Sequence, residues 1–234
     1  MRILILGSTG ASGILATREA LSTFKSCTII LFVRTPSKIP SDISSDPSVI
    51  IVEGQLDDQD ALSKALEGVD AVISFLGPVV SLKDGPFHPS DTPIAHAYEL
   101  IIKLMHAHGA KRLIALGTTS ITDPQDKFSL KYSAMVAAVK TVAYNSWKDI
   151  VAIGETIRSQ GSDLDWTIVR VPILTSGNDK GVIAGYIGDG KTGSTLARAG
   201  FASFTVQQVD STEWIKKAPL ITSACENVSE LSVN

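Results

Sequence analysis

Cysteine is the first residue type in short supply. The chain has two cysteines among 234 residues, Cys27 and Cys225, which lie far apart and match no metal-ligand spacing. Two isolated cysteines build no disulfide framework, so the sequence favours a reducing compartment. Cys27 opens an apolar run, and we expect it to be a buried small hydrophobic residue.

Clustered positive charge and long apolar runs are also missing. The formal net charge is −3 and the basic residues form no run, whereas nucleic-acid binding needs a clustered basic face. The N-terminus has one charge, Arg2, before an apolar run that stops at glycine, which is not the pattern of a signal peptide. No apolar stretch approaches the length of a membrane span. We therefore expect a cytoplasmic protein without nucleic-acid, membrane or metal partners.

What the sequence does contain is an alternation of short apolar runs with longer amphipathic segments. With 44% hydrophobic and 19% charged residues, the chain can bury a sizeable core. The runs are rich in Ile, Val and Leu and nearly continuous, which is typical of strands covered on both faces. The predicted strands are 2–6, 28–33, 49–52, 71–76, 112–117 and 166–171. The predicted helices are 14–24, 58–68, 93–109 and a long one from about 129 to 161.

This rhythm predicts an α/β fold with a doubly wound parallel sheet of Rossmann type. We expect a single domain over residues 1–234, with a dinucleotide-binding core at 1–171 and a C-terminal extension at 172–234. The extension is predicted to pack over one end of the sheet and cover the substrate side. Within the extension, we predict a hairpin or loop over residues 181–193, and a short strand or turn followed by a helix over residues 204–218.

A glycine loop, GSTGASG, follows the first predicted strand and precedes a helix. This is the context that a dinucleotide-binding loop requires. Gly7 would make the tight turn, Gly10 would let a pyrophosphate approach the backbone, and Gly13 would allow close helix packing. The helix N-terminus would then face the phosphates. By itself the G-x-x-G-x-x-G spacing also fits a turn without a ligand.

The second predicted strand ends VRTPSK, with Arg34 and Lys38 where an NAD-specific protein would place an acidic residue. A cation there suits a ribose 2′-phosphate, so the pattern favours NADP(H) over NAD(H). A solvated surface charge is the alternative interpretation of Arg34.

The stretches ILILGSTGASG, VRTPSKIP, VEGQLDD, ISFLGP and LDWTIVRVP together resemble the atypical short-chain dehydrogenase/reductase family, in particular its NmrA-like, NAD(P)-binding branch. The resemblance covers nearly the whole chain. It implies that the glycine loop holds the pyrophosphate, that Arg34 binds the 2′-phosphate, that Gln55 and Leu56 flank the adenine, and that Leu76 and Gly77 lie near the nicotinamide ribose. Gln55 departs from the aspartate more often found there, but an amide can still hydrogen-bond to an adenine edge. The full predicted cofactor set is Gly7, Ser8, Thr9, Gly10, Ala11, Ser12, Gly13, Ile14, Arg34, Lys38, Gln55, Leu56, Leu76, Gly77 and Pro172.

Many members of that family use a Tyr-x-x-x-Lys pair on a helix, with a hydroxyl residue after the fifth strand. Here the matching residues are Tyr144 and Lys148 in YNSWK, and Thr118 and Ser120 in GTTS. Residues i and i+4 share a helix face, and a nearby ammonium lowers a phenol pKa, so the tyrosine could exchange a proton with a substrate carbonyl. In the alternative interpretation neither residue is catalytic: Tyr144 is a packing residue and Lys148 is a solvated surface charge.

Other polar residues give weaker indications. His88, in the long loop 77–93, is a minor acid/base candidate, whereas His106 and His108 lie where histidines complement a helix dipole. Asp57, Asp58 and Asp60 fit a loop and a helix start.

The preferred function is an NADPH-dependent oxidoreductase of a small, hydrophobic carbonyl, enone or quinone-type substrate, with a role in tailoring specialised metabolites. The apolar residues Val79, Val80, Leu82, Phe87, Phe201 and Phe204 suggest such a substrate. A non-redox NADP-binding regulator of NmrA type, and an isomerase, cyclase or dehydratase on the same fold, stay open as alternatives. A monomer and a homodimer are both compatible with the sequence.

Overall fold

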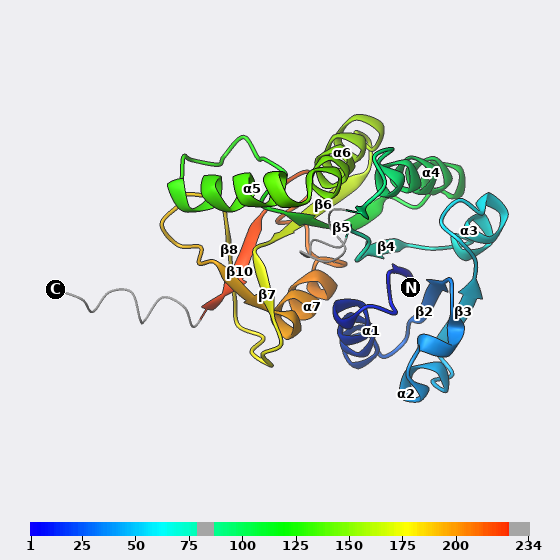
Figure 1. Cartoon of the computed structure of the whole chain (residues 1–234). Coiled ribbons are helices and arrows are strands. Elements are labelled where there is room, and N and C mark those ends of the chain that lie inside the picture. The colour runs from blue at the N-terminus through cyan, green and yellow to red at the C-terminus, as the bar shows by residue number, and fades with distance from the viewer. Residues whose placement is uncertain (79–86, 225–234) are drawn as a thin grey trace.

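The computed structural model describes residues 1–78 and 87–224, and within them an eight-stranded sheet crosses the molecule (Figure 1). All neighbouring strands pair in parallel except β8, which runs antiparallel to β10. The predicted doubly wound α/β fold is confirmed. In spatial order the strands are β3 (Val49–Glu53), β2 (Thr28–Val33), β1 (Arg2–Leu6), β4 (Ala71–Ser74), β5 (Arg112–Thr118), β6 (Asp165–Val171), β10 (Leu220–Ser223) and β8 (Val182–Gly185).

Helices cover both faces of this sheet, as Figure 1 shows. One face packs against α3 (Gln59–Ala65), α4 (Pro93–His108) and α6 (Tyr144–Gln160). The other packs against α1 (Ala11–Thr23), the short α2 (Ser41–Ser44) and α7 (Arg198–Gln207). A 3-10 turn, η1 (Pro36–Lys38), follows β2.

The strand sequences explain this two-sided burial. Successive side chains of a strand point to opposite faces, so Ile3 and Ile5 enter one core while Leu4 and Leu6 enter the other. All four side chains are fully buried. A strand with this composition is stable only when helices cover both of its faces. Cys27 is buried at the start of β2, as predicted, whereas Cys225 lies outside the described residues.

The prediction of one long helix from 129 to 161 is wrong, because the structure contains two helices there, α5 (Leu130–Val142) and α6. The break is at Ala143, whose φ of −137° and ψ of 58° are not helical. The apolar pattern continues through the break, so periodicity alone did not reveal it. The break changes the direction of the chain. As a result α6 packs along α4, whereas α5 extends away from α6 toward β8 and β10 (Figure 1).

The expected arrangement of the C-terminal extension is also corrected. Instead of packing over one end of the sheet, β8 and β10 extend the sheet beyond β6. The helix of this region, α7, precedes the segment 209–218, which contains turns and no helix. A separate parallel pair joins β7 (Ile173–Thr175) to β9 (Thr195–Ala197). The strand β10 is only four residues long and has no flanking periodicity, which explains why the sequence pattern did not identify it.

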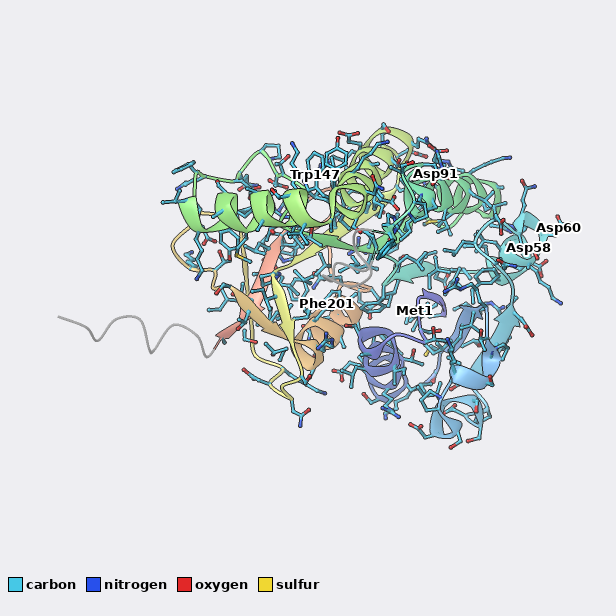
Figure 2. All side chains as sticks on the ribbon, in the orientation of Figure 1. Met1, Asp58, Asp60, Asp91, Trp147 and Phe201 are labelled. Carbon is cyan, nitrogen blue, oxygen red and sulfur yellow. The ribbon has the colours of Figure 1, made fainter. Side chains whose placement is uncertain are left out.

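Side-chain contacts attach α7 to the rest of the fold, among them a ring pair and the contacts of a buried arginine. The ring of Phe201, labelled in Figure 2, packs edge-on against Phe75 with a centroid distance of 5.1 Å. Arg112, at the start of β5, donates from Nε and Nη2 to the carbonyl of Gln208 at 2.9 and 2.7 Å. Burial lowers the pKa of Arg112 to about 10, although the charge of Asp165 acts in the opposite direction. The guanidinium therefore fixes the C-terminal end of α7 against the sheet.

Candidate dinucleotide site

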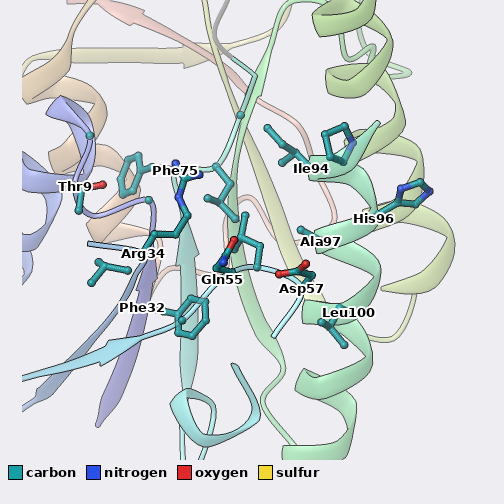
Figure 3. A pocket seen from close by; sticks show the side chains of 18 of the residues that line it. Thr9, Phe32, Arg34, Gln55, Asp57, Phe75, Ile94, His96, Ala97 and Leu100 are labelled. Carbon is teal, nitrogen blue, oxygen red and sulfur yellow. The ribbon is translucent and has the colours of Figure 1, made fainter. Parts of the chain in front are cut away.

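A cavity of about 780 Å³ opens at the carboxyl ends of β1, β2, β3 and β4 (Figure 3). Its walls come from the glycine loop, the residues that end these strands, and the start of α4. The lining residues are Gly7, Thr9, Gly10, Phe32, Val33, Arg34, Gly54, Gln55, Leu56, Asp57, Phe75, Leu76, Gly77, Asp91, Pro93, Ile94, His96, Ala97 and Leu100. This position, outside the carboxyl ends of parallel strands, is where doubly wound sheets bind ligands.

The glycine loop is shaped by two positions that exclude a side chain. Gly7 has a φ of +75°, a conformation that other residues rarely adopt, and so makes the predicted tight turn. A Cβ on Gly13 would lie 2.3 Å from the carbonyl oxygen of Gly7 and 2.7 Å from the Cα of Ser8. The first turn of α1 therefore packs directly on the loop backbone.

Gly10 differs, because its own surroundings do not require glycine. A Cβ there would meet only the carbonyl oxygen of Gly7, at 3.5 Å. Gly10 lines the cavity and precedes α1, which has neither a side-chain cap at its N-terminus nor an acidic residue in its first turn. The first backbone N–H groups of a helix have no partners inside the helix, so this end favours an anion. The hydroxyl of Ser8, in the same loop, is buried and has no hydrogen-bond partner among the described residues.

Arg34 directly follows β2 and reaches the cavity wall beside the glycine loop (Figure 3). Within residues 1–78 and 87–224 it forms no ion pair or hydrogen bond, so no carboxylate of that part competes for its guanidinium. A free, forked donor set of this kind is suited to a phosphate. Together with the glycine loop, Arg34 makes the cavity fit a phosphorylated dinucleotide.

Eight of the predicted cofactor residues line this cavity: Gly7, Thr9, Gly10, Arg34, Gln55, Leu56, Leu76 and Gly77. The other seven, which do not line it, are Ser8, Ala11, Ser12, Gly13, Ile14, Lys38 and Pro172. Pro172 follows β6, two strands beyond β4 in the sheet. The sequence did not identify Phe32, Phe75 or any α4 residue as part of the cavity wall. The α4 residues were hidden because a helix face reaches a cavity only through tertiary packing. The position of Pro93 at the start of a helix near this sheet edge was the available signal.

None of the four residues predicted to be catalytic is among those that line this cavity. Thr118 and Ser120 are at the carboxyl end of β5, where the Thr118 Oγ1 accepts from the Ser120 N–H at 3.2 Å. Tyr144 is half-exposed and its ring lies 5.6 Å from that of Trp147. Lys148 donates from Nζ to the carbonyl of Ser90 at 2.9 Å. Of the loop 77–93, residues 79–86, including Val79, Val80 and Leu82, lie outside the described residues.

Several histidines and aspartates that the sequence analysis named have structural partners. His106 Nε2 lies 2.9 Å from Asp163 Oδ1, and His108 Nε2 lies 2.8 Å from Ser63 Oγ. Asp58 caps α3 as predicted, because its Oδ1 accepts from the Ala61 N–H at 3.0 Å. In the part of the chain that the structure describes, no three His, Cys, Asp or Glu side chains are grouped as metal ligands. The helices described there are also too short or too polar to cross a membrane.

The fold and this cavity together define a Rossmann-type dinucleotide-binding protein. The family model described as NAD(P)H-binding matches residues 7–212, so the chain belongs to the NAD(P)H-binding family. The expected relationship to atypical short-chain dehydrogenases/reductases is confirmed at this level, and so is a nicotinamide dinucleotide as the cofactor class. Among curated proteins, none matches the chain by sequence.

Solved structures share the fold at low sequence identity. A short-chain dehydrogenase/reductase from Veillonella parvula in complex with NADP has a TM-score of 0.72 and 16% identity, over 95% of this chain and 94% of the other. A Rossmann-fold NAD(P)-binding family protein from Shigella flexneri has a TM-score of 0.67 and 22% identity, over 95% and 93%. An anaerobillin reductase from Escherichia coli O157:H7 has a TM-score of 0.72 and 13% identity, over 95% and 97%.

Proposed function

We propose that this protein is an NADPH-dependent oxidoreductase that reduces a small, hydrophobic carbonyl, enone or quinone-type substrate, in the tailoring of specialised metabolites. One observation carries the cofactor preference: Arg34 lies on the cavity wall where an NAD-specific protein would place a carboxylate, and no described residue pairs with its guanidinium. The NADP complex of the Veillonella protein and the reductase activity named for the Escherichia coli protein support the proposal by analogy.

The chain's own residues divide the binding work. The backbone N–H groups around Gly10 and the N-terminus of α1 bind the pyrophosphate, and Arg34 binds the 2′-phosphate. Gln55 and Leu56 flank the adenine. The bound cofactor supplies a hydride; the protein has to orient the acceptor and provide a proton.

For the proton we propose Tyr144, with Lys148 one turn further along the same helix face and Thr118 and Ser120 orienting the substrate oxygen. Tyr144→Phe removes only the phenol oxygen and keeps the ring that packs on Trp147. In this mechanism kcat falls by roughly 100-fold or more, while the affinity for NADPH is unchanged. A Tyr144→Phe variant with wild-type kcat would show that another group supplies the proton.

The cofactor preference is tested by thermal unfolding with NADP(H) and NAD(H) titrated separately, since a ligand of the native state raises the midpoint. We expect a clearly larger shift with NADP(H). In Arg34→Ala this advantage disappears, because the lost charge-assisted bonds weaken NADPH binding by roughly 10-fold to 100-fold. Lys25→Ala, which removes an exposed cation outside the cavity lining, is the matched control and should bind like the wild type. No shift with either dinucleotide would end the oxidoreductase proposal.

A non-redox NADP-binding regulator is the second candidate, and exposed apolar side chains favour it. Phe128 is 84% exposed and Leu130 is 75% exposed, close together at the start of α5. Exposed apolar groups of this size suit a protein partner. Dinucleotide binding without NADPH oxidation across a panel of aldehydes, enones and quinones would favour the regulator. An isomerase, cyclase or dehydratase would instead convert substrate without net NADPH consumption.

A further inference from the structure

The strongest unexplained feature outside the cavity is a buried carboxylate, Asp149 on α6. Its side chain is completely buried. Its Oδ1 accepts a hydrogen bond from the Ala95 N–H at 2.9 Å, and its Oδ2 accepts one from the Ile94 N–H at 3.2 Å. The Nε2 of His88 lies 2.7 Å from the same Oδ2. A carboxylate taken out of water needs such partners, and this one has three.

Asp149 accepts hydrogen bonds from two backbone N–H groups that have no acceptor within α4 itself. Thr92, which precedes α4, is in the left-handed conformation with a φ of 54° and offers no side-chain cap. Pro93, the first helical residue, has no N–H. The next two N–H groups, of Ile94 and Ala95, would therefore be orphaned without Asp149. The carboxylate also complements the positive end of the α4 dipole. Asp149 thus acts as the N-terminal cap of another helix.

Two neighbours on the same face of α6 hold the chain that leads into this turn. Asn145 donates from Nδ2 to the carbonyl of His88 at 2.8 Å, and Lys148 donates to the carbonyl of Ser90. Residues 145, 148 and 149 lie on one helix face because their spacing is i, i+3 and i+4. Together they fix the segment 88–95 against α6.

The turn that is fixed in this way is also a wall of the dinucleotide cavity. Pro93, Ile94, His96 and Ala97 line the cavity, opposite the glycine loop and Arg34 (Figure 3). The two α4 amides that Asp149 binds belong to this wall or directly adjoin it. A displacement of the turn would therefore change the width of the cavity.

We propose that Asp149 is a positioning residue of the dinucleotide site, which holds the first turn of α4 at the separation from the glycine loop that NADP(H) requires. This inference rests on the proposed function, and it gives α6 a task that does not depend on Tyr144. Asp149 is not among the residues that line the cavity and acts through the backbone of Ile94 and Ala95.

The test compares Asp149→Asn with Asp163→Asn. The first substitution keeps the size of the side chain but turns an NH₂ group toward donors, so one contact is lost. Asp163 serves as the control, because it too pairs with a histidine, but with His106 near the far end of α4. Dissociation constants for NADPH are measured by cofactor fluorescence, well below each variant's unfolding midpoint. We expect at least a 10-fold weaker NADPH affinity for Asp149→Asn and no change for Asp163→Asn.

A second variant, Asn145→Ala, keeps the proposal testable if Asp149→Asn does not fold. It removes one bond to the segment 88–95 and leaves Asp149 in place, so we expect about a 3-fold weaker affinity. A folded Asp149→Asn protein with a lower unfolding midpoint but wild-type affinity would overturn the inference and leave Asp149 a stabilising residue only. Wild-type affinity in Asn145→Ala, where Asp149→Asn is unfolded, would overturn it as well. A wild-type protein that binds no dinucleotide would overturn both this inference and the proposed function, whereas the first two outcomes leave the function standing.

Discussion

At the scale of single residues, Gly10 and Gly13 can be compared directly, because they lie three positions apart in one loop. In Gly13→Ala the new Cβ would overlap the loop backbone, which we expect to lower the free energy of unfolding by about 3 kcal/mol. In Gly10→Ala the Cβ has room, so stability should change by about 1 kcal/mol or less, while NADPH affinity falls because the methyl group occupies the approach of the pyrophosphate. Urea unfolding and NADPH titration of both variants measure the two effects. Unchanged NADPH affinity in Gly10→Ala would contradict the assignment of this position to the ligand.

The same scale shows what the sequence could predict about the site. Gly7, Arg34 and Gln55 come after strands that are mainly apolar, and strand ends of a parallel sheet meet at one edge, so their common location could be inferred. The α4 residues could not, because which helix face meets the cavity depends on how α4 packs. The task of Asp149 was hidden for the same reason: its partners Ile94 and Ala95 lie more than fifty positions away.

At the scale of elements, a buried ion pair joins β6 to the segment between β5 and α5. Arg170 is fully buried, and its Nη1 and Nη2 lie 2.6 and 2.8 Å from the two carboxylate oxygens of Asp126. Burial by itself raises the pKa of Asp126, but the hydrogen bonds and charge of Arg170, together with hydrogen bonds from the Asp123 and Ile187 N–H groups, outweigh it, so the pKa is lowered overall. Ionised Asp126 therefore contributes stability above the ordinary aspartate value near 4, and this contribution is lost as the pH falls through the lower folded-state value.

Asp126→Asn tests this pair. We expect a loss of about 3 kcal/mol in the free energy of unfolding at neutral pH, because the variant leaves the buried Arg170 guanidinium without its counter-charge. Below about pH 4 this difference in the free energy of unfolding should shrink, because the unfolded wild-type chain then binds a proton at Asp126, and at lower pH the folded protein does so too. Urea unfolding across this pH range measures both effects. A difference that is independent of pH would mean that ionisation of Asp126 does not contribute.

The sequence predicted helices and strands correctly where an apolar run was long or was bounded by glycine. It failed at two kinds of position. The break at Ala143 has no glycine or proline to mark it, and tertiary packing of α6 on α4 decides the direction of the chain. The strand β10 is short, and β8 pairs with it rather than with a neighbour in sequence. Pairings between distant segments leave no local signal.

At the scale of the whole molecule, the C-terminal extension shares the main sheet, so we expect it to unfold together with residues 1–171. Ile221, in β10, is fully buried, and Ile221→Ala should cost about 2–5 kcal/mol. Circular dichroism and tryptophan fluorescence should still report one coincident transition. Ile173→Ala, in β7 with its side chain 57% exposed, is the control and should change stability by about 0.5 kcal/mol or less. Two separate transitions would contradict the prediction of a single domain.

The position of β10 also dictates an order in time. β8 precedes β10 along the chain, yet among the strands formed by residues 1–78 and 87–224 its sheet neighbour is β10 alone, which in turn lies against β6. Within the described part of the chain, β8 therefore has no partner strand until β10, which begins at Leu220, has been made and has inserted. Until then β6 is an open edge whose unpaired backbone groups can accept a strand from another molecule. Conditions that slow the arrival of β10 should therefore favour aggregation of the nascent protein over completion of its sheet.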